Sequence, residues 1–270
     1  MTSEAILQQE YSIAPDTVAQ FQRDGWAPLP GLLSPEIAAS ILQHLKASDA
    51  LVAPTKTEKW MTTNDYQKVL RMHDGMAWKD DWFKSLALSP RLSSLALKLM
   101  SRDEGLFIHD MSFIKTGEDG APTPYHQDYP HWPFDRTGAF TIWIALTDMS
   151  EDMGTLKFLP GSHREGPLGR YSHNAADDMC KANPELLRKY PPVGGRALRA
   201  GDATVHLDML VHGAGGNATG KDRAAYTVRY MPKDVIYTGA PHRHFDQFGL
   251  TSGDHFADSP KIPHIGRDRA

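Results

Sequence analysis

The stretch Pro124-Tyr125-His126-Gln127-Asp128, followed by an aromatic turn and the apolar run Phe140-Thr141-Ile142-Trp143-Ile144-Ala145-Leu146, decides how this chain is interpreted. His126 and Asp128 are two positions apart, and residues i and i+2 of an extended strand point to the same face. An imidazole nitrogen and a carboxylate oxygen would then project side by side. The pair could occupy two neighbouring positions on a metal ion and leave the others open.

A third ligand is available far along the chain, in Leu210-Val211-His212-Gly213-Ala214-Gly215. We expect an apolar strand that ends in His212, with a glycine-rich exit that leaves the imidazole clear. Two histidines and one carboxylate on one face of an octahedron is the ligand set of non-haem Fe(II) oxygenases. More ordinary roles are also open: His126 and Asp128 as polar residues at a surface strand end, and His212 as a core histidine bonded to backbone carbonyls.

Three cationic residues are candidates for binding an acid. Arg223 opens the apolar stretch 224–228, where a guanidinium needs an anionic partner or exposure to solvent. A ligand carboxylate fits, because the arginine fork matches two oxygens at once, whereas the alternative is a salt bridge to an Asp or Glu. Arg229 lies on the same strand face and is the competing candidate. Lys115, after the strand 111–114, is either an exposed strand end or a second cationic contact.

The composition argues against a nucleic-acid-binding protein and against a disulfide or thiolate metal site. The chain has 270 residues, a net charge of -4 and one cysteine, Cys180. No global basic field attracts nucleic acid, and a single cysteine provides neither an internal disulfide nor a thiolate metal site. Because no signal peptide or long apolar run is visible, we expect a cytoplasmic protein without a membrane partner. Its expected partner is a small-molecule substrate, and its oligomeric state is left open.

The pattern along the chain predicts one domain over residues 1–270, mainly β with flanking helices. We expect an N-terminal helical flank at about 15–100, with helices from Asp16 to about Arg23 (ended by Gly25), at 35–47 and at 85–100, and a short strand near 69–70. Short strands at regular spacing then favour a sandwich or barrel. They are expected at 106–115, 123–128, 140–147, 155–159, 197–199, 203–206, 210–212 and 224–231. The insert 164–195, with a helical patch at 183–189, is a candidate lid. The tail 233–270 is expected to be polar and loosely structured.

Several short motifs occur in a family-specific order. They are His126-Gln127-Asp128, Trp132-Pro133-Phe134, Gly154-Thr155-Leu156, Leu159-Pro160-Gly161-Ser162-His163, Gly201-Asp202, and His212-Gly213-x-Gly with Arg223. In this combination the chain resembles the phytanoyl-CoA hydroxylase (phytanoyl-CoA dioxygenase) family of Fe(II)/2-oxoglutarate-dependent oxygenases, over about residues 18–232. The resemblance implies a double-stranded β-helix, the cupin-type jelly roll, with its core at about 105–232.

The resemblance also implies roles for individual residues. His126, Asp128 and His212 match the metal ligands and catalytic centre, and Arg223 matches the arginine that binds the distal carboxylate of 2-oxoglutarate. Further positions fall in the cosubstrate pocket (Lys115, Trp143 and Gln127) or after the ligand pair, where they would line the substrate pocket (His131, Trp132 and Phe134). The match at Trp143 needs a one-residue gap. Ala214 stands where some members have a hydroxyl residue, which removes one hydrogen bond to the cosubstrate.

The implied activity is that of a non-haem dioxygenase that uses Fe(II), with 2-oxoglutarate and O2 as cosubstrates and ascorbate as a reductant in vitro. It would hydroxylate a C–H bond of a small secondary metabolite or catabolic substrate and release succinate and CO2. No motif for coenzyme A is present. The same cofactors could instead serve desaturation, epoxidation or ring closure, because substrate placement decides the outcome. The same ligand residues could also belong to a non-catalytic cupin-type metal-binding protein or to a Zn hydrolase.

Overall fold

Two antiparallel sheets form the body of the computed structural model, which describes residues 3–48, 70–115, 117, 122–169 and 178–266. The larger sheet has the order β1 (Trp26–Leu29), β8 (Ala203–Leu207), β5 (Phe140–Ala145), β10 (Arg223–Pro232), β3 (Glu104–Lys115) and β11 (His264–Gly266), with β2 (Leu70–Arg71) paired to β3. The smaller sheet has the order β4 (Thr123–His126), β9 (His212–Ala214), β6 (Leu156–Phe158) and β7 (Val193–Gly194). The expectation of a mainly β fold is therefore confirmed.

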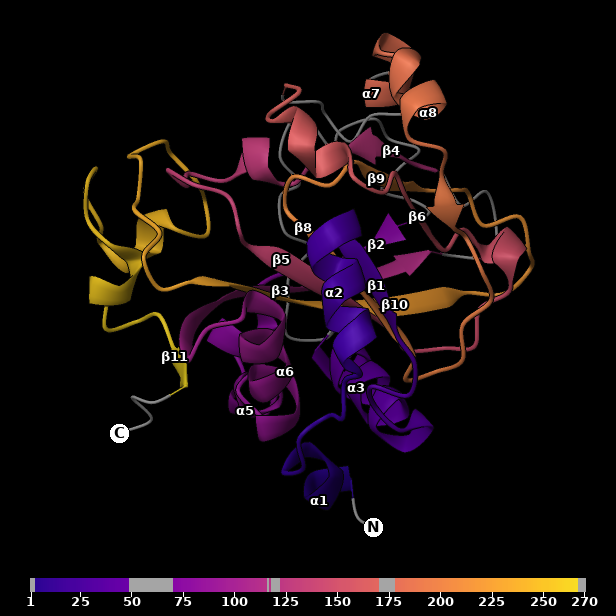
Figure 1. Cartoon of the computed structure of the whole chain (residues 1–270). Coiled ribbons are helices and arrows are strands. Elements are labelled where there is room, and N and C mark those ends of the chain that lie inside the picture. The colour runs from indigo at the N-terminus through magenta and orange to yellow at the C-terminus, as the bar shows by residue number, and fades with distance from the viewer. Residues whose placement is uncertain (1–2, 49–69, 116, 118–121, 170–177, 267–270) are drawn as a thin grey trace.

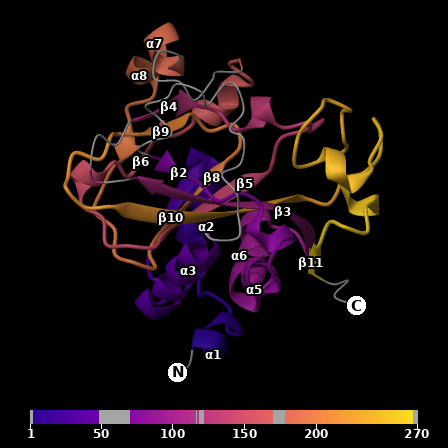
Figure 2. The same cartoon turned by 180° about the vertical axis from the view of Figure 1, so that it is seen from behind.

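The helices form a layer on one face of the larger sheet. Figures 1 and 2 show α2, α3, α5 and α6 on one side of β3, β5 and β10, and β4, β6 and β9 on the other. Leucines and isoleucines of these helices pack onto the sheet in one buried cluster. The α-helices are α1 (Ser3–Leu7), α2 (Pro15–Asp24), α3 (Pro35–Ser48), α5 (Asp81–Ala87), α6 (Pro90–Met100), α7 (Met179–Ala182) and α8 (Glu185–Lys189), and the 3-10 turns are η2 (Met76–Trp78), η3 (Tyr129–His131), η4 (Glu151–Met153), η5 (Ser162–Glu165), η6 (Asp246–Phe248) and η7 (Phe256–Asp258).

Most predicted helices are present, with one correction. Gly25 ends α2 in the left-handed conformation, with φ 79°, as the sequence predicts. The single helix expected at 85–100 is instead two helices, α5 and α6, that meet at Ser89. The cause is Pro90, because a proline disfavours the helical conformation of the residue before it. Ser89 accordingly has φ -58° and ψ 147°.

Several strand boundaries also differ from the prediction. The strand expected at 123–128 ends at His126, and the strand expected at 210–212 begins at His212. No strand covers 197–199, where Leu198 makes only an isolated bridge to Met149. Of the strand near 69–70, residue 69 lies outside the described residues, and Leu70 is in β2.

The C-terminal segment is packed, which corrects the expectation of a loose tail. Phe245, Phe248, Phe256 and Ile262 are buried in a cluster with residues of β3 and β10, and β11 pairs with β3. This segment therefore completes the larger sheet and closes one end of the molecule (Figure 1).

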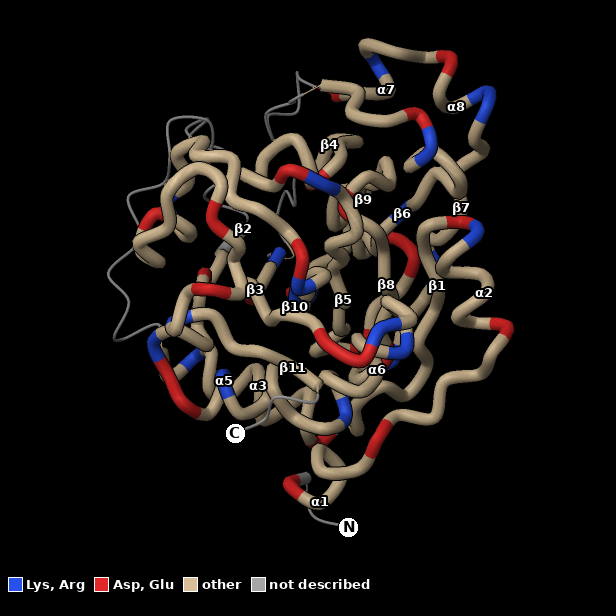
Figure 3. Tube along the Cα trace, turned by 60° about the vertical axis from the view of Figure 1, so that its left-hand side comes forward, with Lys and Arg blue, Asp and Glu red and all other residues tan. Residues whose placement is uncertain are grey.

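Charged residues of both signs are interspersed along the chain (Figure 3). In the residues that the structure describes, no helix is both long and apolar enough to span a membrane.

Candidate metal and cosubstrate site

A cavity of about 280 Å³ is lined by residues from both sheets and by the segment 241–245 of the C-terminal region. His126, Asp128 and His212 border it, together with the cationic residues Arg223 and Arg229. The cavity thus brings together residues that are far apart in the sequence.

His126, Asp128 and His212 converge in this cavity. The ends of β4 and β9 are paired so that His126 lies opposite His212. The Asp128 Oδ1 atom lies 3.6 Å from His126 Nε2 and 4.0 Å from His212 Nε2. One ligand atom from each of the three residues lies within 4.8 Å of the others. The predicted cluster is therefore present.

The route by which Asp128 reaches the cluster differs from the sequence argument. Because β4 ends at His126, Asp128 is not on an extended strand; its φ and ψ are -73° and -42°, at the start of η3. The turn aims its carboxylate at His126 and His212, and Thr141 donates to Asp128 Oδ2 over 3.3 Å. The side-by-side geometry therefore comes from a turn rather than from strand alternation.

The protonation of the three residues fits a divalent metal. The Nδ1 atoms of His126 and His212 lie 2.8 and 2.9 Å from the backbone oxygens of Pro124 and Leu210. A carbonyl only accepts, so each Nδ1 carries a proton and each Nε2 is the ring nitrogen left to face a metal. Burial raises the pKa of Asp128, but the contacts with His126 and His206 outweigh it and hold the pKa well below its ordinary value. Metal ligands must be deprotonated in this way.

Arg223 and Lys115 lie opposite each other on β10 and β3 at one end of the cavity. Arg223, 2% exposed, donates to the backbone oxygens of Gly154 over 2.9 Å and Met153 over 3.4 Å. Its guanidinium lies 5.4 Å from the ring centroid of Trp143. Burial, and secondarily the charge of Arg223, lowers the pKa of Lys115 to about 6. A buried cationic end of this kind suits a carboxylate ligand.

Two glycines bring the backbone close to this end. A Cβ atom on Gly154, whose φ is +73°, would lie 2.2 Å from the Gly215 oxygen. That oxygen accepts a hydrogen bond from Lys115 Nζ over 2.9 Å. Glycine at 154 therefore allows the backbone at Gly154 and Gly215 to lie close together. The Gly154 oxygen then accepts from Arg223, and the Gly215 oxygen accepts from Lys115.

The structure places two expected pocket residues elsewhere. The Gln127 amide donates to the Gly166 and Met209 oxygens and accepts from Leu168 N, so the side chain fastens the insert and does not line the cavity. Phe134 is buried in the C-terminal cluster against Phe245 and Phe256. His131 and Trp132 do line the cavity, as expected.

His206 also borders the cavity, although no sequence motif indicated a role for it. It is 2% exposed, its ring centroid lies 4.2 Å from that of His212, and its Nε2 lies 3.8 Å from Asp128 Oδ2. Within the described residues, neither ring nitrogen of His206 has a hydrogen-bond partner. Strand alternation was the available sequence signal. Residues i and i+2 of a strand share a face, so Thr204 and His206 lie on the same face of β8.

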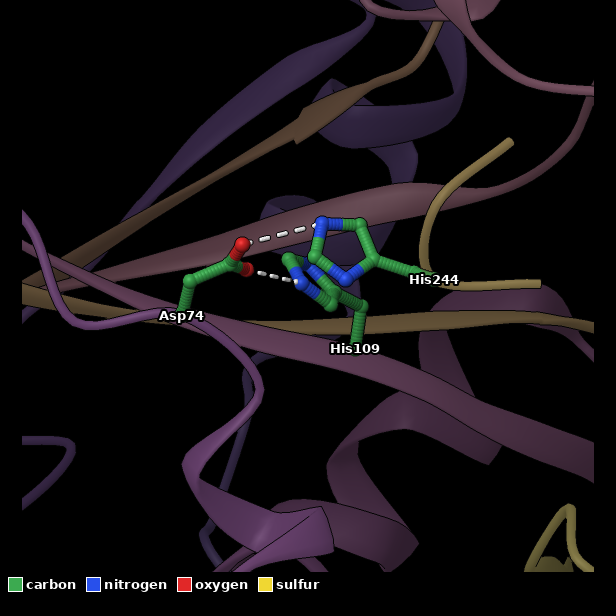
Figure 4. A group of neighbouring side chains, drawn as sticks. All are labelled: Asp74, His109 and His244. Carbon is green, nitrogen blue, oxygen red and sulfur yellow. Dashed lines mark hydrogen bonds and ion pairs between the residues drawn. The ribbon is translucent and has the colours of Figure 1, made fainter. Parts of the chain in front are cut away.

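A second cluster at the other end of the cavity was also missed. Figure 4 shows the Asp74 carboxylate directed at the rings of His109 and His244, with a dashed line to each. Asp74 Oδ1 lies 2.6 Å from His109 Nε2, and Asp74 Oδ2 lies 3.0 Å from His244 Nε2. No sequence motif indicated this cluster, because its members come from three distant segments.

Comparisons with known proteins agree with this fold and site. The family model for phytanoyl-CoA dioxygenase (PhyH) matches residues 21–225. A probable alpha-ketoglutarate-dependent hypophosphite dioxygenase from Stutzerimonas stutzeri is 24% identical over 78% of this chain and 76% of its own. L-proline trans-4-hydroxylase from Streptomyces griseoviridis is 24% identical over 80% of this chain and 85% of its own.

Solved structures show the same architecture. The alpha-ketoglutarate-dependent carbocyclase SnoK from nogalamycin biosynthesis has a TM-score of 0.76 at 23% identity, covering 94% of this chain and 97% of its own. The epimerase SnoN, in complex with Fe3+, alpha ketoglutarate and nogalamycin RO, has a TM-score of 0.72 at 25% identity, covering 92% of this chain and 97% of its own.

The fold is therefore the cupin-type jelly roll of the 2-oxoglutarate-dependent oxygenases. The chain belongs to the phytanoyl-CoA dioxygenase family. The expected enzyme class, a non-haem Fe(II)/2-oxoglutarate-dependent dioxygenase, and its cofactors are confirmed.

Proposed function

We propose that this dioxygenase hydroxylates a C–H bond of a small organic substrate, with His126, Asp128 and His212 as its iron ligands. The assignment is supported by the convergence of two histidine Nε2 atoms and one carboxylate at the wall of a cavity. Bound iron would activate dioxygen at the expense of 2-oxoglutarate, which yields succinate and CO2. The chain's own contribution is to orient the ligands and enclose the reaction.

Arg223 is proposed to bind the distal carboxylate of 2-oxoglutarate, with Lys115 and Trp143 beside it. The support is their shared location at a buried end of the cavity. Lys115, with a pKa of about 6, gains a proton when an anion binds next to it, because a nearby opposite charge favours the charged form. His131 and Trp132, on the rim after the ligand pair, are proposed substrate contacts.

The substrate is proposed to be a small molecule, as the names of the hypophosphite and proline relatives suggest for those enzymes.

Formation of succinate from 2-oxoglutarate tests the function before the substrate is known. Anaerobically purified protein, supplied with Fe(II), ascorbate and O2, should form succinate slowly. His126→Ala should abolish this turnover, because it removes a ligand, and Arg223→Ala should weaken it roughly 10- to 100-fold, the loss of a charge-assisted contact.

Arg102→Gln is the matched control. Arg102 is half exposed and forms an ion pair with Asp234 away from the cavity, so its loss should leave succinate formation unchanged. Equal turnover in wild type and His126→Ala would overturn the ligand assignment. With a substrate in hand, a product that gains one oxygen atom supports hydroxylation, whereas loss of two hydrogens indicates desaturation. Cytoplasmic location stays a prediction that cell fractionation tests.

A further inference from the structure

The cavity has a second cationic side that the cosubstrate does not need. Arg223 and Arg229 both line the cavity and lie on the same face of β10, six residues and roughly 20 Å of strand apart. Their contacts are different: Arg223 is held by Gly154 and Met153, and Arg229 by Thr141 and His109. Arg229 therefore faces the end of the cavity opposite the proposed 2-oxoglutarate site.

Arg229 is a buried cation whose contacts are neutral groups. It is 8% exposed. Its Nε donates to Thr141 Oγ1 over 3.2 Å, its Nη1 donates to His109 Nδ1 over 2.8 Å, and its guanidinium lies 5.8 Å from the ring centroid of Trp132. Arg229 takes part in none of the ion pairs found among the described residues. A buried charge without a counterion favours binding of an anion.

His109 fixes the position of this guanidinium. Arginine can only donate, so His109 Nδ1 accepts and the ring proton resides on Nε2, which donates to Asp74 Oδ1 over 2.6 Å. Burial lowers the pKa of His109 to about 3 although Asp74 acts in the opposite direction, so the ring is neutral. We call Asp74, His109, Arg229, Arg243 and His244 the Asp74 network.

The Asp74 network is not suited to hold a metal ion, although three of its residues have the spacing for one. His109 Nε2 carries a proton and has no lone pair to offer. Asp74 Oδ2 already accepts from Arg243 Nη2 over 2.6 Å, and His244 Nε2, 3.0 Å from Asp74 Oδ2, accepts from Arg243 Nε over 2.9 Å (Figure 4 shows the histidine contacts). Guanidinium groups on two sides would also repel a cation. The network instead fastens the segment 241–245 and holds Arg229 at the cavity wall.

Among the described residues, no carboxylate is in direct contact with Arg229. Asp74 pairs with Arg243. Asp128 and Asp110 attract Arg229 electrostatically, but the proposed function commits Asp128 to the metal and Asp110 already accepts a hydrogen bond from Tyr226. An acidic ligand would therefore be the first anion to contact this guanidinium directly.

A neutral donor lies at the same end of the cavity. The backbone N–H of His244 donates to His242 Nδ1 over 3.3 Å, which leaves the ring proton of His242 on Nε2. Burial, and secondarily the neighbouring His244, lowers the pKa of His242 to about 3. His242 lines the cavity and stacks on Phe245 at 4.5 Å.

We propose that Arg229, assisted by His242, is a subsite for an acidic group of the prime substrate, so that the substrate is a small organic acid. The neighbouring walls, which include Ile108, Met111, Trp132 and Phe245, would contact its apolar body. The carboxylate would bind at Arg229 as a second acid, separate from the cosubstrate acid at Arg223. The inference rests on the proposed function and specifies its substrate class.

The test compares small carboxylates with their neutral amides. The probes are phenylacetate, 3-phenylpropionate and cyclohexanecarboxylate, each beside its primary amide, added without oxygen to protein loaded with Fe(II) and 2-oxoglutarate. Calorimetry gives the affinities, and the visible band of the iron–cosubstrate complex shows whether 2-oxoglutarate stays bound. At least one carboxylate should bind about tenfold or more tightly than its amide, as a charge-assisted contact predicts.

Variants assign the preference to a residue. Arg229→Gln should remove the preference for the acid, Arg229→Lys should retain part of it because the charge stays, and the distant Arg102→Gln should retain all of it. Three results would overturn the subsite: no carboxylate binds better than its amide, the preference survives in Arg229→Gln, or the acid displaces 2-oxoglutarate. Absence of the band in wild type before any probe is added would instead contradict the proposed function.

Discussion

Lys115 is the residue whose protonation should respond most directly to a cosubstrate bound at the proposed site. It is 1% exposed, and burial, with the nearby charge of Arg223, lowers its pKa to about 6. Above that pH the Lys115 amine is mostly neutral. It must take up a proton before it can pair with a bound anion. The affinity for 2-oxoglutarate should therefore fall as pH rises through and beyond about 6.

Lys115→Met tests this coupling. The variant should bind 2-oxoglutarate roughly tenfold more weakly near pH 6, because one charged contact is lost. Its affinity for 2-oxoglutarate should also change much less with pH. Calorimetry in two buffers of different ionisation enthalpy measures the proton uptake, which should disappear in the variant. The same pH dependence in Lys115→Met and wild type would show that another group takes up the proton.

At this scale the sequence predicts residue types better than their conformations. His126, Asp128, His212 and Arg223 follow from spacing and resemblance, and each borders the cavity. The turn at Asp128 and the tautomer-fixing carbonyls are not visible in the sequence, because both depend on backbone geometry. Gln127 was predicted to reach the cosubstrate pocket because it stands between two proposed ligands, whereas its side chain reaches Gly166 and Met209.

Among the elements, the C-terminal segment departs most from expectation. Its polar composition suggested a loose tail, yet its few aromatic residues are spaced so that they meet β3 and β10 in one cluster. Single-segment patterns do not reveal such packing, because the partners in β3 are distant in sequence. The helices were easier to predict, since caps and prolines act locally, and Pro90 marks the break that a purely apolar pattern hides.

Phe256→Ala measures how far this segment stabilises the fold. Phe256 is 0% exposed, and its truncation should lower the free energy of unfolding by about 3–5 kcal/mol. Urea denaturation measures the change. Leu187→Ala is the control, because Leu187 is 37% exposed and should change stability by no more than about 0.5 kcal/mol. A similarly small loss for Phe256→Ala would show that the tail is not part of the core.

Across the whole molecule, the two ends of the cavity are built from different parts of the chain. The end at Arg223 uses β3, β10 and the glycine turns, whereas the end at Arg229 also needs Asp74 and the C-terminal segment. The first end matches the family's motifs and could be predicted from them. The second carries no motif, because it forms only when three distant segments fold together. That the chain acts as one domain over residues 1–270 stays a prediction.

We propose that His126, Asp128 and His212 hold iron while Arg223 binds 2-oxoglutarate. The decisive experiment is to add 2-oxoglutarate to the Fe(II) protein without oxygen and to record the visible charge-transfer band. We expect a band in wild type and in Arg102→Gln, no band in His126→Ala, and a band in Arg223→Ala only at much higher cosubstrate concentration. A wild-type protein with bound iron and no band at saturating 2-oxoglutarate would contradict it.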